Sequence, residues 1–219
     1  MDLSSIFRFS DMVEYFPKIL SRFPVTLLIV VVSVAGGLVL GFILAAARIF
    51  KIPVLKELAA LYISFVRGTP ILVQLFVVYY GLPLLVAPLG VDINHWSKLI
   101  FVLVTYLLND GAFMSEIIRS SIESVPKGQL EAAASVGLTT FQTYKRIIIP
   151  QAFKIAAPAF GTRVVGSFQA TAMAFTLGII DIMGQVKAIG TRTNRVLEGY
   201  VDAAIIFIIV SYLLERLFT

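Results

Sequence analysis

The stretch EAAASVGLTTFQTYKRIIIP, residues 131–150, is polar and basic and stands between two long apolar segments. Pro126, just before it, suits the first turn of a helix, and residues 127–136 are rich in good helix formers. Gly137 then supplies the left-handed residue that commonly ends a helix. The first half of the stretch therefore predicts a short helix that stops at a glycine turn.

The second half of the stretch carries its own helix signal. Thr139 is followed three residues later by Gln142, which is a capping-box pattern that opens a helix. We expect this helix to run to about Ile149 and to end before Pro150. Two short helices joined at a glycine turn make a rigid knob, and packed helices transmit force because they move as units.

Composition places the rest of the chain in a membrane. Of the 219 residues, 58% are hydrophobic and 14% are charged, against about 25% charged in a soluble domain, and the mean hydropathy is +0.93. The sequence predicts an all-α integral membrane protein, one domain over residues 1–219, with five spans of about 20 residues. The predicted spans are residues 25–47, 58–85, 99–118, 155–180 and 201–218, with a knob-bearing loop at 119–154.

The N-terminal segment is predicted to stay on the protein. The first apolar run begins only at Val25, is too long for the apolar core of a signal peptide, and follows acidic residues. Residues 7–23 alternate apolar and charged side chains, with Ser10-Asp11 as a possible helix start. Two interpretations stay open for them: a short interfacial helix lying on the membrane, or an ordered tail outside it.

The basic residues of the loops predict the orientation. Cytoplasmic loops carry an excess of Lys and Arg, and two loops on the same side do so; one holds Arg48, Lys51 and Lys56, the other Arg119, Lys127, Lys145, Arg146 and Lys154. On the opposite side Lys98 stands alone before span three, although the last loop fits less well. That last loop holds Lys187, Arg192 and Arg195. We predict an outside N-terminus and a cytoplasmic C-terminus, and the dispersed net charge of +5 gives no reason to expect nucleic acid.

Few residues are suited to catalysis or metal binding. The chain has no cysteine, and its one histidine, His95, lies beside Trp96 in an outer loop, which is typical of an interfacial aromatic belt. No HExxH pair and no glycine-rich phosphate loop occurs. We therefore predict that the chain is not an enzyme and holds no metal, and that ATP, if it is used, binds another chain.

The knob resembles the EAA motif, E-A-A-x3-G-x9-I-x-[LI]-P, of the membrane subunits of ABC importers. The matching positions are Glu131, Ala132, Ala133, Gly137, Ile147, Ile149 and Pro150. Two further segments, residues 124–129 and residues 65–70 with Gln74, are similar to the polar amino-acid permease branch of that family. The resemblance runs from about Tyr15 to Phe218.

The resemblance implies an ATP-driven importer in a bacterial cell membrane. In such importers two five-span permeases, identical or different, pair with two ATPase subunits that bind ATP and Mg²⁺, and a separate extracytoplasmic protein delivers the amino acid. The knob would dock on the ATPase, through Lys127, Glu131, Ala132, Ala133, Gly137 and Pro150. Cystine, glutamine or a basic amino acid would be carried. An ATP-independent channel or a secondary transporter is the alternative, although no clear internal repeat supports the latter.

Polar residues inside the spans predict the substrate path. Such residues are costly against lipid and should face the interior, and spacings of three and four place them on common helix faces. The candidates are Arg67, Asn109, Glu116, Arg163, Ser167, Gln169 and Thr171. Hydrogen bonding between helices is the alternative role for them. Gly36, Gly37 and Gly41 are assigned to close helix packing.

One segment departs from the family pattern. Many relatives resemble Lys-Asp-Thr-Ser-Leu where residues 169–173 read QATAM, so a lysine and an acid are missing here. A substrate-binding role carried over from that lysine does not apply to Gln169. We hypothesise that the extracytoplasmic partner, more than the permease, selects the amino acid.

Overall fold

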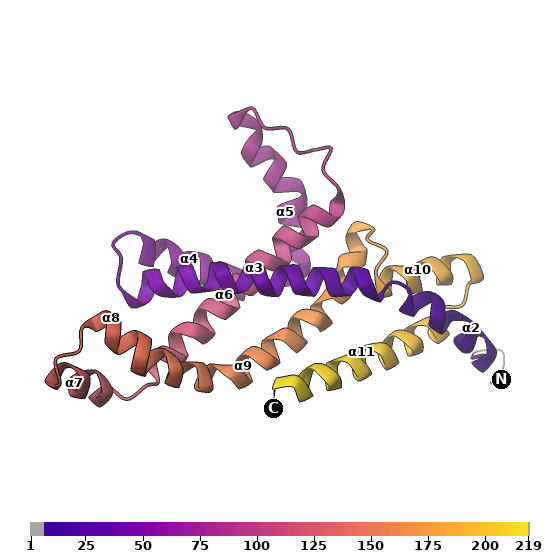
Figure 1. The fold of residues 1–219 in the computed structure, drawn as a ribbon. Helices are drawn as coiled ribbons and strands as arrows, with labels where there is room; N and C mark the ends of the chain where they lie inside the picture. The colour runs from indigo at the N-terminus through magenta and orange to yellow at the C-terminus, as the bar shows by residue number, and fades with distance from the viewer. Residues whose placement is uncertain (1–6, 219) are drawn as a thin grey trace.

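The computed structural model describes residues 7–218, and every regular element in that range is a helix (Figure 1). The helices before the knob are α2 (Phe9–Leu20), α3 (Phe23–Ile49), α4 (Leu55–Gly68), α5 (Ile71–Val86), η1 (Ala87–Leu89) and α6 (Lys98–Glu123). Those that follow are α7 (Gly128–Ser135), α8 (Thr140–Thr143), η2 (Tyr144–Ile148), α9 (Ile149–Ala170), η3 (Thr171–Leu177), α10 (Ile182–Thr193) and α11 (Leu197–Phe218).

Four of these helices are long and apolar enough to cross a membrane: α3, α5 with η1, α6 and α11. A fifth span is possible if the segments Thr140–Leu177 and Ile182–Thr193, which meet at a bend of 44°, count as one. The structure thus confirms the predicted all-helical fold with up to five spans. The last span begins at Leu197, four residues before the predicted start.

The centre of the molecule is the pair α3 and α6, which lie against each other with almost no side chain between them. A Cβ placed on Gly37 would lie 2.6 Å from the Cβ of Asp110, and one on Gly41 would lie 2.9 Å from the backbone nitrogen of Ser115. Such distances are too short for any side chain. Close packing is therefore the role of these glycines, as the sequence predicted.

This contact leads to a prediction for Gly37→Ala. The added methyl meets backbone at Gly111, 3.0 Å from its nitrogen, so neither helix can yield by a side-chain rotation. We expect overpacking to cost about 1–3 kcal/mol, measured as a lower melting temperature of the purified protein in detergent. Gly81→Ala in α5, where a Cβ meets nothing within 4 Å, is the control and should be neutral. Equal melting temperatures for both variants would contradict the close approach of α3 and α6.

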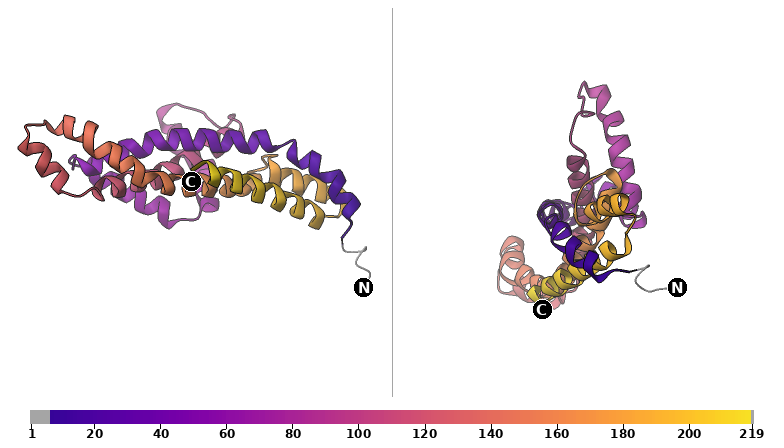
Figure 2. Two further views of the ribbon diagram at one scale, coloured as in Figure 1. Left: turned by 60° about the horizontal axis from the view of Figure 1, so that its bottom comes forward. Right: turned by 90° about the vertical axis from the view of Figure 1, so that its right-hand side faces the viewer.

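The predicted second span, residues 58–85, is two helices rather than one. Thr69 is extended, with φ −119° and ψ 142°, and Pro70 caps the next helix. Proline excludes the helical conformation at the residue before it, so the chain must leave the helix there. Helix α4 stays beside α3, whereas α5 projects from the bundle (Figures 1 and 2) and buries only Gln74 and Leu75.

The predicted fourth span, residues 155–180, also differs. It starts at Ile149, changes to a 3₁₀ helix at Thr171, and ends at Gly178, whose φ of +85° is left-handed. The Asp181 side chain then accepts a hydrogen bond of 2.8 Å from the Gly184 nitrogen and caps α10. What the sequence suggested was the last loop is thus mostly a helix, with Lys187 and Arg192 on it.

The knob is α7 and α8, joined by the Gly137 turn. Gly137 has a φ of +77°, and the capping box is complete: the Thr139 nitrogen donates to Gln142 at 2.9 Å, and the Gln142 nitrogen donates back at 3.3 Å. Both local predictions are confirmed. The first helix, Gly128–Ser135, is shorter than the expected 127–136, because Lys127 and Val136 are its N-cap and C-cap residues.

The prediction that the second knob helix ends before Pro150 is wrong. Helix α8 continues through the π-helical turn η2 into α9, and Pro150 occupies the first turn of α9. Proline is tolerated there because the π turn has already interrupted the regular hydrogen-bond ladder, so its missing N–H leaves no further gap. The second knob helix and the fourth span are therefore one continuous helical segment.

The N-terminal segment forms α2, which packs on α10 and α11. Tyr15 and Ile19 are buried in a cluster with residues of both helices. The helix starts at Phe9 rather than at Ser10-Asp11, and no side chain caps it. Instead the Arg8 nitrogen donates to Glu198 at 3.0 Å, so tertiary contact fixes the start. Whether α2 lies on a membrane stays a prediction.

Candidate functional site

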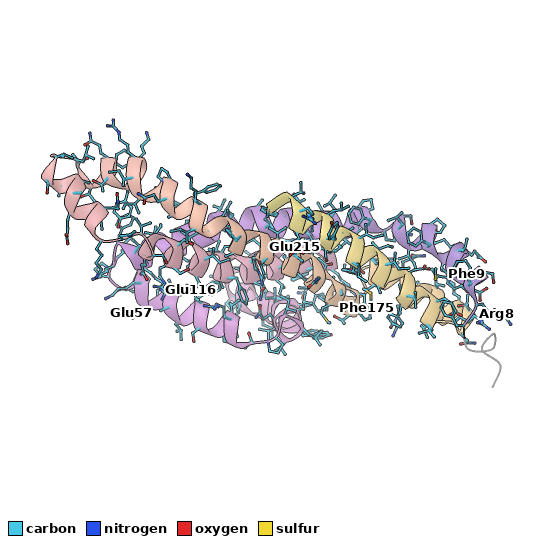
Figure 3. The ribbon with its side chains drawn as sticks, turned by 90° about the horizontal axis from the view of Figure 1, so that it is seen from below. Arg8, Phe9, Glu57, Glu116, Phe175 and Glu215 are labelled. Atoms are coloured by element: carbon cyan, nitrogen blue, oxygen red, sulfur yellow. The ribbon has the colours of Figure 1, made fainter. Side chains whose placement is uncertain are left out.

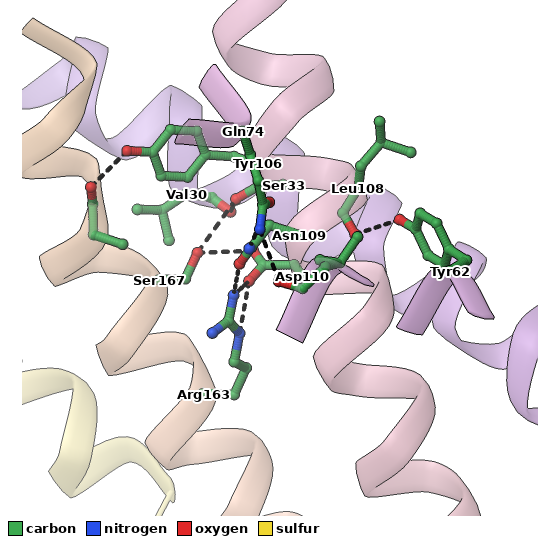
Figure 4. Close-up of polar contacts among 12 residues, drawn as sticks. Val30, Ser33, Tyr62, Gln74, Tyr106, Leu108, Asn109, Asp110, Arg163 and Ser167 are labelled. Carbon is green, nitrogen blue, oxygen red and sulfur yellow. Dashed lines mark hydrogen bonds and ion pairs between the residues drawn. The ribbon is translucent and has the colours of Figure 1, made fainter. Parts of the chain in front are cut away.

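Six polar side chains meet where α3, α6, α9 and the junction of α4 and α5 come together (Figure 4). We name this group the central polar cluster; it consists of Ser33, Gln74, Asn109, Asp110, Arg163 and Ser167. Five of the six residues are buried, and Arg163 is half-buried. Polar groups in such a place need partners, and each finds one within the cluster.

Asp110 and Arg163 form the ion pair at the middle of the cluster. The Arg163 Nε donates to Asp110 Oδ1 at 2.8 Å, and its Nη2 contacts the same oxygen. Ser167, one turn along α9, donates to Asp110 Oδ2 at 2.7 Å. The Asp110 side chain is 1% exposed and that of Arg163 16%. Both carboxylate oxygens are thus satisfied, and the pair ties α6 to α9.

Asn109 extends the cluster to the break in the second span. It accepts a hydrogen bond of 2.6 Å from Arg163 Nη2 and donates to the Gln74 side-chain oxygen at 2.9 Å. The Gln74 amide in turn donates to the backbone oxygens of Val66 at 2.7 Å and Thr69 at 3.0 Å. These carbonyls end α4 and have lost their helical partners, so Gln74 stabilises the break.

The guanidinium groups of two arginines lie over the ring of Phe113. Arg163 lies 4.1 Å from the ring centroid and Arg67 lies 5.5 Å from it. Arg163 is neutralised by Asp110, whereas Arg67 is exposed and no described residue gives it a carboxylate partner. Arg67 is therefore the guanidinium of the site that can receive an external anion.

The structure brings only some of the predicted path residues together. Asn109, Arg163 and Ser167 meet in the central polar cluster and Arg67 lies beside it, but Glu116 does not. Glu116 lies seven residues along α6 from Asn109, about 10 Å farther toward the knob (Figure 3). It pairs with Arg48 at 2.6 Å and with Arg119. Glu116 therefore lies outside the central polar cluster, although it shares a face of α6 with Asn109.

Gln169 and Thr171 also lie outside the cluster. The Gln169 side chain is exposed and donates to Ser211 on α11 at 3.4 Å. Thr171 is buried, and its hydroxyl donates to the Phe168 carbonyl at 2.6 Å. For Thr171 the predicted common helix face ends because η3, which begins at this residue, has three residues per turn. The α-helical spacing of three and four residues applies only up to Ala170.

Four residues of the site were not among the sequence-predicted candidates. Asp110 carried a signal, since an acid in mid-span is costly, and Gln74 carried one through its place in the family-like segment. Phe113 carried only a weak signal, since its spacing of four residues from Asn109 places the two on one helix face. Ser33 carried no signal, because a serine on an apolar span is common and its contact with Ser167, at 3.5 Å, depends on tertiary structure.

The predicted coupling residues lie on the surface of the knob. Lys127, Glu131, Ala132 and Gly137 are exposed, and Ala133 is buried beneath them. Large apolar side chains are exposed next to them, Val136 to 75% and Phe141 to 73%. An exposed surface that combines charge with large apolar groups is typical of a protein interface. Pro150, by contrast, lies on α9 and not in the knob.

Comparison with known proteins places the chain among transport proteins. Residues 37–219 match the family described as "Binding-protein-dependent transport system inner membrane component". The chain is similar to the L-cystine transport system permease protein TcyL of Bacillus subtilis (strain 168), with 42% identity over 205 residues, 94% of this chain and 86% of TcyL. It is also 39% identical to the probable amino-acid ABC transporter permease protein PatM of Vibrio harveyi, over 96% of this chain and 92% of PatM.

Solved structures give the same result at the level of the fold. A chain in a structure described as "Crystal structure of an amino acid ABC transporter with histidines" superposes with a TM-score of 0.86 at 31% identity, over 97% of this chain and 96% of that one. A chain of the MetNI methionine ABC transporter in an inward-facing conformation superposes with a TM-score of 0.72 at 18% identity, over 90% of this chain and 92% of the other. The second likeness concerns the fold alone.

Proposed function

The chain belongs to the family of binding-protein-dependent transport system inner membrane components, and we propose that it carries a polar amino acid into the cytoplasm as the permease of an ATP-driven importer. The observation that carries the proposal is the knob. The Gly137 turn holds Glu131 and Gly137 at the surface, next to the capped helix α8, which continues through η2 and α9 to Arg163 in the central polar cluster.

The remaining parts of the importer are proposed from the family. Two ATPase subunits would bind ATP and Mg²⁺ and receive the knob, a second permease, identical or paralogous, would pair with this one, and an extracytoplasmic protein would deliver the amino acid. Residues 1–219 would form one permease domain with its N-terminus outside and its C-terminus in the cytoplasm. The loops rich in Lys and Arg support that orientation.

The substrate class is proposed from chemistry and from the relatives. TcyL is named as an L-cystine permease, and ArtQ of Bacillus subtilis, 35% identical to this chain, as an arginine permease. Cystine and a basic amino acid fit these names, and glutamine is kept as the third candidate from the family resemblance. Each carries an α-carboxylate, and a guanidinium group binds a carboxylate through two parallel hydrogen bonds. Arg67 has its donors available for that contact.

Replacing Arg67 by glutamine is therefore expected to weaken transport without weakening the fold. Loss of one charge-assisted contact should raise the KM of uptake roughly tenfold. The melting temperature should stay unchanged, because Arg67 is exposed and joins no described ion pair. Arg22→Gln, at an exposed arginine before α3, is the control in the same proteoliposome assay. An unchanged KM for Arg67→Gln would remove Arg67 from the path.

The proposal as a whole is tested by assembly and ATP hydrolysis. The chain is co-purified with its native ATPase and binding protein, and hydrolysis is measured as L-cystine, L-glutamine and L-arginine are added in turn. Stimulation by one of them supports the importer and names the substrate. Uptake of the same amino acid in liposomes without ATP would instead favour a channel or a secondary transporter.

A further inference from the structure

A polar concavity lies beside the first turn of α6, at the end of that helix that is farther from the knob. It has a volume of about 630 Å³ and is open to the outside. Three elements build it: the aromatic face of α5, the start of α6, and the last turn of η3 with α10 behind it. The residues that define its chemistry are Phe76, Tyr79, Tyr80, Lys98 and Lys187.

The position of this concavity follows from α6. Lys98 is the first residue of α6, and the last is Glu123, next to the knob. A helix of 26 residues spans about 39 Å, so the concavity and the knob are separated by nearly the full length of the bundle. Figure 3 shows Phe175, which also lines the concavity, in the half that carries Arg8, whereas Glu116 lies toward the knob.

The concavity is also distinct from the central polar cluster. Lys98 and Asn109 are eleven residues apart on α6, which separates them by roughly 16 Å along the helix axis. Between these levels lies a buried apolar cluster that contains Val102 and Tyr106 of α6 and Leu75 of α5. The two polar sites therefore follow one another along the bundle with an apolar layer between them.

The two lysines are the cations of the concavity. Both are exposed, and no carboxylate among residues 7–218 pairs with either. The Lys98 Nζ lies close to the backbone of Gly178, 3.5 Å from where a Cβ would be. Two ammonium groups that line one concavity without a counter-charge favour an anionic occupant.

The rest of the wall suits the other parts of a zwitterion. The last turn of η3 ends at Gly178, whose nitrogen donates to the Phe175 carbonyl at 2.8 Å. The two carbonyls that follow Phe175 have no partner within the helix, so they can accept hydrogen bonds from an ammonium group. The ring of Tyr79 meets that of Tyr80 edge to face at 4.9 Å, and Phe76 stacks on Tyr80 at 6.3 Å. These rings offer an apolar wall and a favourable surface for a cation.

We propose that this concavity is an entry subsite that receives the amino-acid zwitterion before it reaches the central polar cluster. Lys98 and Lys187 bind the α-carboxylate, the end of η3 accepts from the α-ammonium group, and the aromatic face of α5 packs against the side chain. The proposal rests on the proposed function and adds a second binding site to it. It also gives the exposed aromatic face of α5 a role.

Protection of the lysines from an amine-reactive reagent tests the site directly. The purified importer complex, without its binding protein, is labelled in the presence of L-arginine or L-cystine and, in parallel, of agmatine or cystamine, which lack the carboxylates. Labelling of Lys98 and Lys187, read by mass spectrometry, should fall several-fold with the amino acid that is carried and stay unchanged with its decarboxylated analogue. Lys56, near the knob end and with a side chain that is 43% exposed, reports on the general reactivity.

Transport by the double variant Lys98→Gln/Lys187→Gln supplies the second measurement. We expect the KM of uptake to rise roughly tenfold, with the maximal rate of ATP hydrolysis retained, and Lys56→Gln should behave as wild type. If the amino acid does not protect the lysines and the KM of the double variant is unchanged, the entry subsite is overturned. The proposed function still stands in that case as long as the wild type takes up the amino acid. Absence of protection with a higher concentration of binding protein needed for half-maximal ATPase stimulation would also overturn it, in favour of a docking surface for acidic residues.

Discussion

Replacing Asp110 by alanine is expected to destabilise the protein by about 3–5 kcal/mol, because Arg163 is then left in the bundle without its counter-charge. The Asp110 side chain is 1% exposed and accepts hydrogen bonds from both Arg163 and Ser167. Water cannot replace a partner that is so deeply buried. The loss is measured as a lower melting temperature in detergent and as a smaller yield of monodisperse protein.

A double substitution separates the cost of an unpaired charge from any role in transport. In Asp110→Leu/Arg163→Met both charges are gone and similar volumes remain, so most of the lost stability should return. Asp92→Asn, in an exposed loop, serves as the control for removing one acid and should leave the melting temperature unchanged. A double variant as unstable as Asp110→Ala would show that the pair contributes more than mutual neutralisation.

Gly137→Val is expected to leave insertion and folding intact and to uncouple ATP hydrolysis from uptake. Gly137 has a φ of +77°, and no atom lies within 4 Å of an added Cβ, so the penalty comes from backbone strain rather than from crowding. We expect this strain to cost about 1–3 kcal/mol. That cost would change an equilibrium between two positions of α7 roughly 5- to 150-fold. Uptake per ATP hydrolysed, measured in proteoliposomes, should fall accordingly.

Two matched variants show whether conformation is the cause. Gly137→Asn places a residue that tolerates the left-handed region and should retain most of the coupling. Gly128→Val adds the same side chain in equally open space, but in the helical region of α7, and should retain coupled uptake. Normal coupled uptake by Gly137→Val would exclude the knob turn from the coupling path.

The features that could be predicted from the sequence are those fixed by neighbours in the chain. The Gly137 turn and the Thr139 capping box depend on a few residues each, and the structure has both. The apolar spans follow from composition, and the close packing at Gly37 follows from glycines at helical spacing. The break at Pro70 also has a local cause, because proline disfavours the helical conformation at Thr69 before it.

The features that could not be predicted depend on tertiary register or on a change of helix type. The pairing of Asp110 with Arg163 requires α6 and α9 to meet at one level, which no local pattern specifies. Thr171 left the predicted stripe because the helix becomes 3₁₀ there, and Pro150 did not end a helix because a π turn precedes it. In each case a contact or a ladder change overrode a correct local rule.

The chain from Thr140 to Ala170 is one helical rod, roughly 45 Å long at 1.5 Å per residue. Its backbone hydrogen bonds run along its axis, so the helix resists compression. Two places in it depart from the α-helical ladder: η2, Tyr144–Ile148, and Pro158, which has no N–H to donate. In the proposed importer, a displacement of α8 would therefore reach Arg163 reduced only by the bending or twisting that these two places allow.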